Sequence, residues 1–212
     1  MATIAELKTK FNKLIARTNR EGMEDLMKWL DTETDFFSAP ASTRFHGNYA
    51  GGLIEHSIHV AEFSITNLNW IIRYKPEFVK LEESIIIAAL FHDVCKINQY
   101  HWGEEKFTKI AQNGRDRWAK YETYGFKDEL PMGHGEKSIY YVSQHIKLTI
   151  SEILAIRWHM STSEVGTQID GLTKYAYQQA FDDPLVKIIA ASDQLSTVLG
   201  DAIDYKANAR II

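Results

Sequence analysis

The residues best suited to chemistry are histidines and aspartates that stand in apolar sequence. His92 and Asp93 follow the run Ile85–Phe91, which is apolar at every position. A helix with no polar face must be buried, so its end also lies in the interior. An unpaired buried carboxylate costs several kcal/mol. Asp93 therefore needs a cation, either a side chain such as Lys96 or a metal ion. The alternative is a His–Asp pair satisfied by hydrogen bonds alone.

Four other predicted helices each contribute one more residue of this kind. His56 lies on an apolar strip of its helix, and Asp193 follows an apolar stretch in another. His134 begins a helix, and His159 ends one. Alone, each is more often a hydrogen-bonded core or capping residue. Together in one small bundle they indicate a metal site. Imidazole and carboxylate donors suit Mn, Fe, Ni, Co, Zn or Mg rather than a cysteine-type structural zinc.

Apolar residues at helical spacing predict the elements that position these side chains. The expected helices cover residues 3–18, 22–31, 53–74, 82–95, 134–147, 150–160, 172–181 and 184–200. The helix over 53–74 is apolar on two sides, with Trp70 on its second strip, and should be largely buried. Thr149 and Glu152 have the spacing of a capping box at the start of the helix over 150–160. The predicted fold class is all-α.

The stretches between these helices are predicted from glycine, proline and small residues. Loops are expected at 32–52 and 161–171. Glycines and Pro131 interrupt residues 98–132, where we expect an irregular excursion with a β-hairpin over 106–124. No linker stands out, so the chain is expected to form a single domain.

Composition limits the possible partners. The chain has 212 residues, a formal net charge of −4 and one cysteine. The acidic balance implies no general attraction to membranes or long nucleic acid. No apolar run approaches the roughly 20 residues that cross a bilayer, and the start MATIAELK has no apolar signal segment. One cysteine excludes an internal disulfide. We expect a cytoplasmic protein, and the sequence does not indicate its oligomeric state.

The order of the histidines and aspartates resembles the HD-domain metal-dependent phosphohydrolase superfamily. The matching stretches are GGLIEHSIHV, AALFHDVCK, LPMGHGEKS, ILAIRWHM and AASDQLSTV, within about 40–198. The block SAPASTRFHGNYAGGLIEHS is similar to the entry of the HD domain in bacterial 3′-to-5′ exoribonucleases. GHGEKS and IRWHM are similar to small HD proteins of bacteria and phages. The resemblance implies an HD-domain helical bundle over 1–212. Its core spans about 40–200, the helices within 3–31 pack on it, and the insertion lies around 98–132.

The resemblance also implies a ligand set. The ligands of a first metal are His56, His92, Asp93 and Asp193. His134 and His159 match ligands of a second metal, or hydrogen-bond around the first. Two-metal members usually carry a His–His pair where this chain has Trp158 and His159, so one donor is missing. The resemblance therefore implies one divalent ion, with a second possible.

Other positions are candidates for catalysis and substrate binding. Asp93 and Lys96 are the expected catalytic residues, because Lys96 matches the lysine of HD-x-x-K that contacts substrate phosphate. Arg44 and His46, in the preceding loop, are further phosphate-binding candidates. Glu136 either caps its helix or acts as a base near the substrate. Cys95 replaces a glycine common in this motif and is not expected to be a nucleophile.

The implied function is hydrolysis of a phosphoester in a nucleotide or short oligonucleotide by metal-activated water. The partner would be a small phosphorylated substrate, with no membrane and no long nucleic acid. Two alternatives stay open. The domain could bind a nucleotide as a non-catalytic sensor. It could also be an HD-type di-iron oxygenase, which shares the ligand order but needs both metals.

Overall fold

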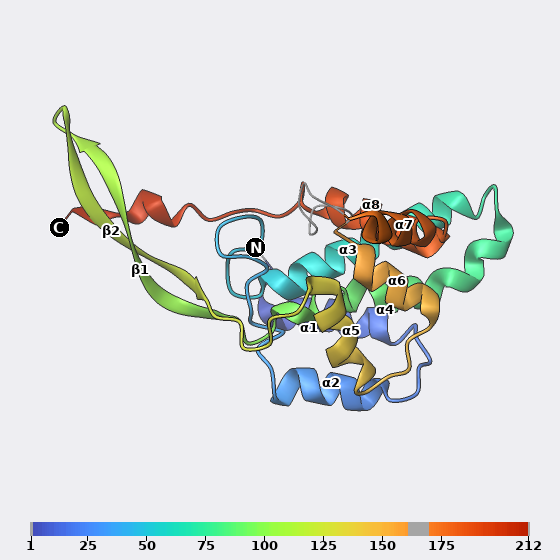
Figure 1. Cartoon of the computed structure of the whole chain (residues 1–212). Helices are drawn as coiled ribbons and strands as arrows, with labels where there is room; N and C mark the ends of the chain where they lie inside the picture. Colours follow the sequence, from blue (N-terminus) through green and yellow to red (C-terminus); the bar gives the residue numbers. More distant parts are fainter. Residues whose placement is uncertain (1, 161–169, 212) are drawn as a thin grey trace.

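The computed structural model describes residues 2–160 and 170–211, so most of the loop predicted at 161–171 lies outside the described residues. The helices form one body, from which a long two-stranded hairpin projects (Figure 1). The helices are α1 (Ile4–Ile15), α2 (Met23–Thr32), α3 (Gly52–Ile71), α4 (Glu82–Phe91), α5 (His134–Ser143), α6 (Ile150–Trp158), α7 (Gly171–Ala180) and α8 (Pro184–Ser196). The helical fold class predicted from the sequence, with a hairpin insertion, is confirmed.

Helix α4 is the centre of the body. All of Ile85–Phe91 is buried, because α4 packs against α1, α3, α6 and α8. After Phe91 the chain turns into a short 3₁₀ helix, Val94–Lys96. His92 and Asp93 occupy the junction and are themselves buried. The prediction that an all-apolar helix delivers these two residues into the interior is therefore confirmed.

Helix α3 packs between α4 and α8 and buries most of its inner residues, as predicted. The placement of Trp70 on a buried strip is wrong, because its side chain is 60% exposed. Trp70 lies in the last turn of α3, where Ile71 and Ile72 are themselves only half-buried. Its ring contacts that of Tyr74 instead, with 5.0 Å between centroids.

Aromatic residues attach the N-terminal helices to this core. The ring of Phe11 on α1 makes edge-to-face contacts with Phe36, Phe37 and Phe91 at centroid distances of 5.6, 5.7 and 6.0 Å. Such pairs contribute beyond the apolar area that they bury. They hold the loop after α2 against the end of α4.

A buried ion pair joins three further segments. Glu152, fully buried at the start of α6, accepts hydrogen bonds from both terminal nitrogens of Arg20, at 2.9 and 2.8 Å. It also accepts one from the Ser84 hydroxyl at 2.7 Å. The backbone N–H of Thr149 donates to it at 2.8 Å and completes the predicted capping box. This carboxylate thus connects the α1–α2 connection, α4 and α6.

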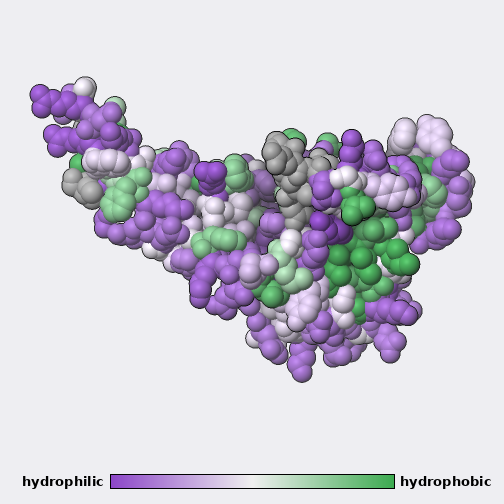
Figure 2. All heavy atoms as spheres, viewed as in Figure 1, coloured by the Kyte–Doolittle hydropathy of each residue, from purple (hydrophilic) through white to green (hydrophobic). Residues whose placement is uncertain are grey.

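The hairpin is longer than the predicted range of 106–124. Strands β1 (Tyr100–Gln112) and β2 (Arg115–Phe126) pair antiparallel along their whole length. Asn113 and Gly114 both have positive φ, +52° and +73°, as a tight type I′ connection requires. Hydrophilic side chains cover the outer end of this arm (Figure 2).

The C-terminal segment contacts both the β1–β2 hairpin and the loop before α3. Strand β3 (Arg210–Ile211) pairs with β2, and Tyr205 packs its ring on Trp102 at 5.0 Å. The side chain of Asn48 exchanges two hydrogen bonds with the backbone of Ile203, at 2.9 and 2.7 Å. Among the described helices, none is long and apolar enough to cross a membrane.

Candidate metal centre

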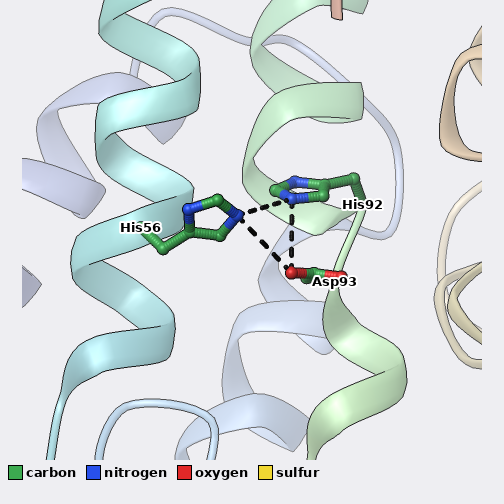
Figure 3. A group of neighbouring side chains, drawn as sticks. All are labelled: His56, His92 and Asp93. Atoms are coloured by element: carbon green, nitrogen blue, oxygen red, sulfur yellow. Dashed lines mark hydrogen bonds and ion pairs between the residues drawn. The ribbon is translucent and has the colours of Figure 1, made fainter. Parts of the chain in front are cut away.

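Three side chains, one from α3 and two from the junction after α4, converge at one point. His56 projects from α3 toward His92 and Asp93 (Figure 3). The Nε2 atoms of His56 and His92 lie 3.1 Å apart. Asp93 Oδ2 lies 3.5 Å from His56 Nε2 and 3.4 Å from His92 Nε2. All three residues are buried.

Asp193 of α8 joins the same group. Its Oδ1 lies 3.1 Å from His56 Nε2 and 3.7 Å from His92 Nε2. Nitrogen and oxygen donors that bind one ion at about 2.0–2.2 Å lie about 3.0–3.6 Å from one another. Four of the five distances given above fall in this range, and the fifth exceeds it by 0.1 Å. The resemblance assigns four residues to a first metal, and the first and last of them are 137 positions apart along the chain. In the fold these four residues lie together.

The hydrogen bonds of the outer ring nitrogens determine which atoms face this point. His92 Nδ1 donates to the Ala89 carbonyl oxygen at 2.7 Å, since a carbonyl can only accept. The Ser196 hydroxyl donates its hydrogen to the Asp193 carbonyl at 2.7 Å, so it accepts from His56 Nδ1 at 3.1 Å. In the neutral form of each ring the lone pair is then on Nε2, which faces the centre of the group. This orientation by outer hydrogen bonds is typical of metal-binding histidines, and a cation at the centre would be bound by both Nε2 atoms.

The charges of the group suit a cation. Burial lowers the pKa of His56 to about 4, so its imidazole is neutral at pH 7. Burial opposes ionisation of Asp193, but the contact with the His56 imidazole and the field of His92 lower its pKa to about 2. Burial likewise opposes charge on Asp93, but Lys96 and His92 hold its pKa well below the usual range. Burial also opposes charge on His92, yet the Asp93 carboxylate raises its pKa. Two ionised carboxylates thus create a field that attracts positive charge.

His134 and His159 lie beside this group. His159 Nε2 is 3.5 Å from Asp93 Oδ1, and its ring centroid is 4.7 Å from that of His92. His134 Nδ1 is 3.2 Å from the sulfur of Cys95. The ring of Trp158 packs on Tyr177 of α7, at 5.6 Å between centroids.

Cys95 is a potential donor that the sequence reasoning missed. Its position two residues after Asp93 is the sequence signal that indicates this role. Burial raises the pKa of its thiol to about 12, so the thiol is neutral at pH 7. Asp93, Cys95 and His134 form a second group of possible metal donors.

The remaining predicted site residues differ in their surroundings. Lys96 Nζ lies 2.6 Å from Asp93 Oδ2, and the ring of His46 lies 5.1 Å from that of His56. Arg44 is exposed and lines a pocket of about 420 Å³ together with residues of the hairpin and the C-terminal segment. Glu136 forms an ion pair with Arg157 of α6. Lys96 and His46 thus adjoin the four-residue centre, whereas the contacts of Arg44 and Glu136 are with other residues.

Gly135 allows α5 to approach α6 at this site. A Cβ atom there would lie 2.5 Å from Arg157 Cα and 2.8 Å from the Ile156 carbonyl oxygen. Because both are backbone atoms, Gly135→Ala is expected to force the helices apart and to cost about 1–3 kcal/mol of unfolding free energy. Urea denaturation measures this cost. Gly171→Ala is the control, since a Cβ at Gly171 meets nothing within 4 Å. Equal stability of the two variants would contradict the prediction.

Comparison of the sequence with known protein families agrees with this geometry. The HD-domain family model matches residues 53–198, which include all four converging residues. No curated protein and no solved structure gives a significant match. Most members of the HD-domain family are metal-dependent hydrolases. Because the match covers more than half of the sequence, the chain belongs to the HD-domain family.

Proposed function

We propose that the protein is a metal-dependent phosphohydrolase that cleaves a phosphoester of a nucleotide or short oligonucleotide. The observation that carries this proposal is the convergence of the Nε2 atoms of His56 and His92, 3.1 Å apart, with one carboxylate oxygen each from Asp93 and Asp193. Two imidazoles and two carboxylates suit a divalent cation such as Mn, Fe, Ni, Co, Zn or Mg. Membership of the HD-domain family makes hydrolysis the chemistry to test first.

The four residues His56, His92, Asp93 and Asp193 would hold the ion. A divalent ion bound there would activate water as a nucleophile and draw negative charge from the phosphoryl oxygens. Two neighbouring groups orient the imidazole rings. The Ser196 hydroxyl and the Ala89 carbonyl orient the two imidazoles through their Nδ1 atoms.

Lys96 is the second proposed catalytic residue. Burial opposes charge on its ammonium group, but Asp93 raises its pKa, so it remains charged at neutral pH. Its side chain is 12% exposed, which limits screening by solvent and salt. A fixed cation beside the reacting phosphate stabilises the charge that gathers on the phosphoryl oxygens in the transition state.

His46 and Arg44 are proposed to bind the substrate. Burial lowers the pKa of His46, so it is a neutral hydrogen-bonding group at pH 7. Arg44 can grip a second phosphate in two parallel hydrogen bonds. We assign Glu136 an indirect role, in which it positions Arg157. The net charge of −4 favours small substrates over long nucleic acid.

The test is phosphate release from a panel of nucleotides and dinucleotides with Mn²⁺, Ni²⁺, Co²⁺, Zn²⁺ or Mg²⁺. We expect turnover by the wild type, and loss of turnover in Asp193→Asn. Asp182→Asn, which alters an exposed carboxylate just before α8, should keep wild-type activity. Tight nucleotide binding without turnover would instead support the sensor alternative. Oxygen consumption by the iron-loaded protein would support the oxygenase.

A further inference from the structure

Asp93 presents its two carboxylate oxygens to two different groups of side chains. Oδ2 faces His56 and His92 at 3.5 and 3.4 Å. Oδ1 faces His159 Nε2 at 3.5 Å and the sulfur of Cys95 at 4.0 Å. A carboxylate in this position can bind one cation with each oxygen, as in two-metal sites.

Cys95 and His134 provide further donors on the Oδ1 side. Cys95 Sγ lies 3.2 Å from His134 Nδ1, and the donor atoms of Asp93, Cys95 and His134 all lie within 4.8 Å of one another. A thiolate and an imidazole that share one zinc ion, at about 2.3 and 2.1 Å, lie about 3.1–3.6 Å apart. The two side chains are thus already spaced to hold one ion.

A thiol–imidazole hydrogen bond could explain the contact of Cys95 with His134, but it leaves His159 unexplained. His159 is 1% exposed, and its Nδ1 lies 2.7 Å from the Ile156 carbonyl oxygen, to which it must donate. Its Nε2 has no hydrogen-bond partner within the described part of the chain. It faces the ionised Asp93 oxygen at 3.5 Å. A buried polar nitrogen without a hydrogen bond is unfavourable, and an ion bound at Asp93 Oδ1 would lie beside it.

We propose that Asp93, Cys95 and His134, with His159 beside them, form a second metal site whose ligands include the Cys95 thiolate. This site depends on the proposed function only in sharing Asp93 with the first centre. On binding, the Cys95 thiol releases its proton to solvent and its sulfur bonds to the ion. Cys95 would replace the histidine donor that is missing at Trp158. A sulfur ligand favours Zn²⁺ or Co²⁺ over Mg²⁺.

Cobalt provides a direct test, because thiolate bound to Co²⁺ gives an intense near-ultraviolet charge-transfer band. The wild type, titrated in thiol-free buffer, is expected to bind two equivalents of Co²⁺ and to show the band. Cys95→Ser should lose the band and bind one equivalent. Asp193→Asn should keep the band, since Asp193 contributes to the first centre alone. A wild type that binds cobalt without the band, or a band that survives in Cys95→Ser, would overturn the proposal.

A second measurement needs no variant. Cys95 is the sole cysteine of the chain, so a sulfur ligand near 2.3 Å in X-ray absorption by the zinc-loaded wild type identifies it. A zinc environment of nitrogen and oxygen alone would count against the site. Neither measurement requires turnover. A protein that shows the cobalt band but releases no phosphate would keep this site and refute the proposed hydrolysis.

Discussion

Asp93→Asn is expected to lower phosphate release by at least about a thousandfold. The amide cannot supply the negative charge that balances a divalent ion, and both proposed metal sites share this one carboxylate. Loss of about 4 kcal/mol of transition-state stabilisation corresponds to a thousandfold. The measurement is the rate constant for the best nucleotide of the panel at saturating metal.

The same substitution should remove the stabilisation that metal gives to the folded state. Wild-type protein is expected to melt at a higher temperature with Mn²⁺ or Zn²⁺ than with chelator, by mass action on the folded state. Asp93→Asn should melt at the same temperature in both conditions. It should also be less stable with chelator, because Lys96 loses the carboxylate 2.6 Å from its Nζ. A metal-induced shift as large as that of the wild type would refute the role of Asp93.

Glu152→Ala is expected to have the largest effect on stability of any substitution distant from the metal centre. It leaves the half-buried Arg20 without its bidentate partner and removes the capping box of α6. Breaking a buried ion pair from one side costs about 3–5 kcal/mol. That is a large share of the roughly 5–15 kcal/mol by which whole domains are stable. Urea denaturation followed by circular dichroism measures the change.

Glu82→Ala is the matched control, since Glu82 pairs with Arg17 on the surface, where each side chain is about 40% exposed. Exposed pairs contribute about 0–1 kcal/mol. A cost for Glu152→Ala no larger than that of Glu82→Ala would contradict the prediction.

The pH dependence supplies an independent check on Glu152. Burial opposes its ionisation, but Arg20 and Ser84 lower its pKa in the folded protein. A carboxyl group with a lowered folded pKa adds stability above its unfolded pKa, and that stability is lost as pH falls through the folded value. The wild type should therefore lose stability on acidification below about pH 4.5. Glu152→Gln, which does not titrate, should show a weaker loss.

The sequence was most informative where local pattern and burial agree. The run Ile85–Phe91 has no polar face, so both its central position and the burial of His92 and Asp93 could be predicted. The capping box of Thr149 and Glu152 could also be predicted, because both partners lie within one turn.

Contacts between distant segments could not be predicted. Trp70 has the spacing of a buried residue, but it lies in the last turn of α3, where the next two residues are only half-buried. Nothing local to Glu152 indicates Arg20, 132 positions earlier. The hairpin was predicted too short, although Asn113–Gly114 is a strong signal for a tight turn. The contact of Cys95 with His134 could not be predicted either, because the two residues are 39 positions apart. Together with Asp93, this contact makes Cys95 a possible metal donor.

The two hydrogen bonds between Asn48 and Ile203 join segments on either side of the region that the family model matches. Both residues lie outside the stretch 53–198 that matches the family model, and so does His46, whose ring lies against that of His56. The surroundings of the proposed metal site on this side therefore come from two segments that flank the matched region and are hydrogen-bonded to each other. A substitution in either flank can therefore change the surroundings of His46 without altering the helices that carry the four converging residues.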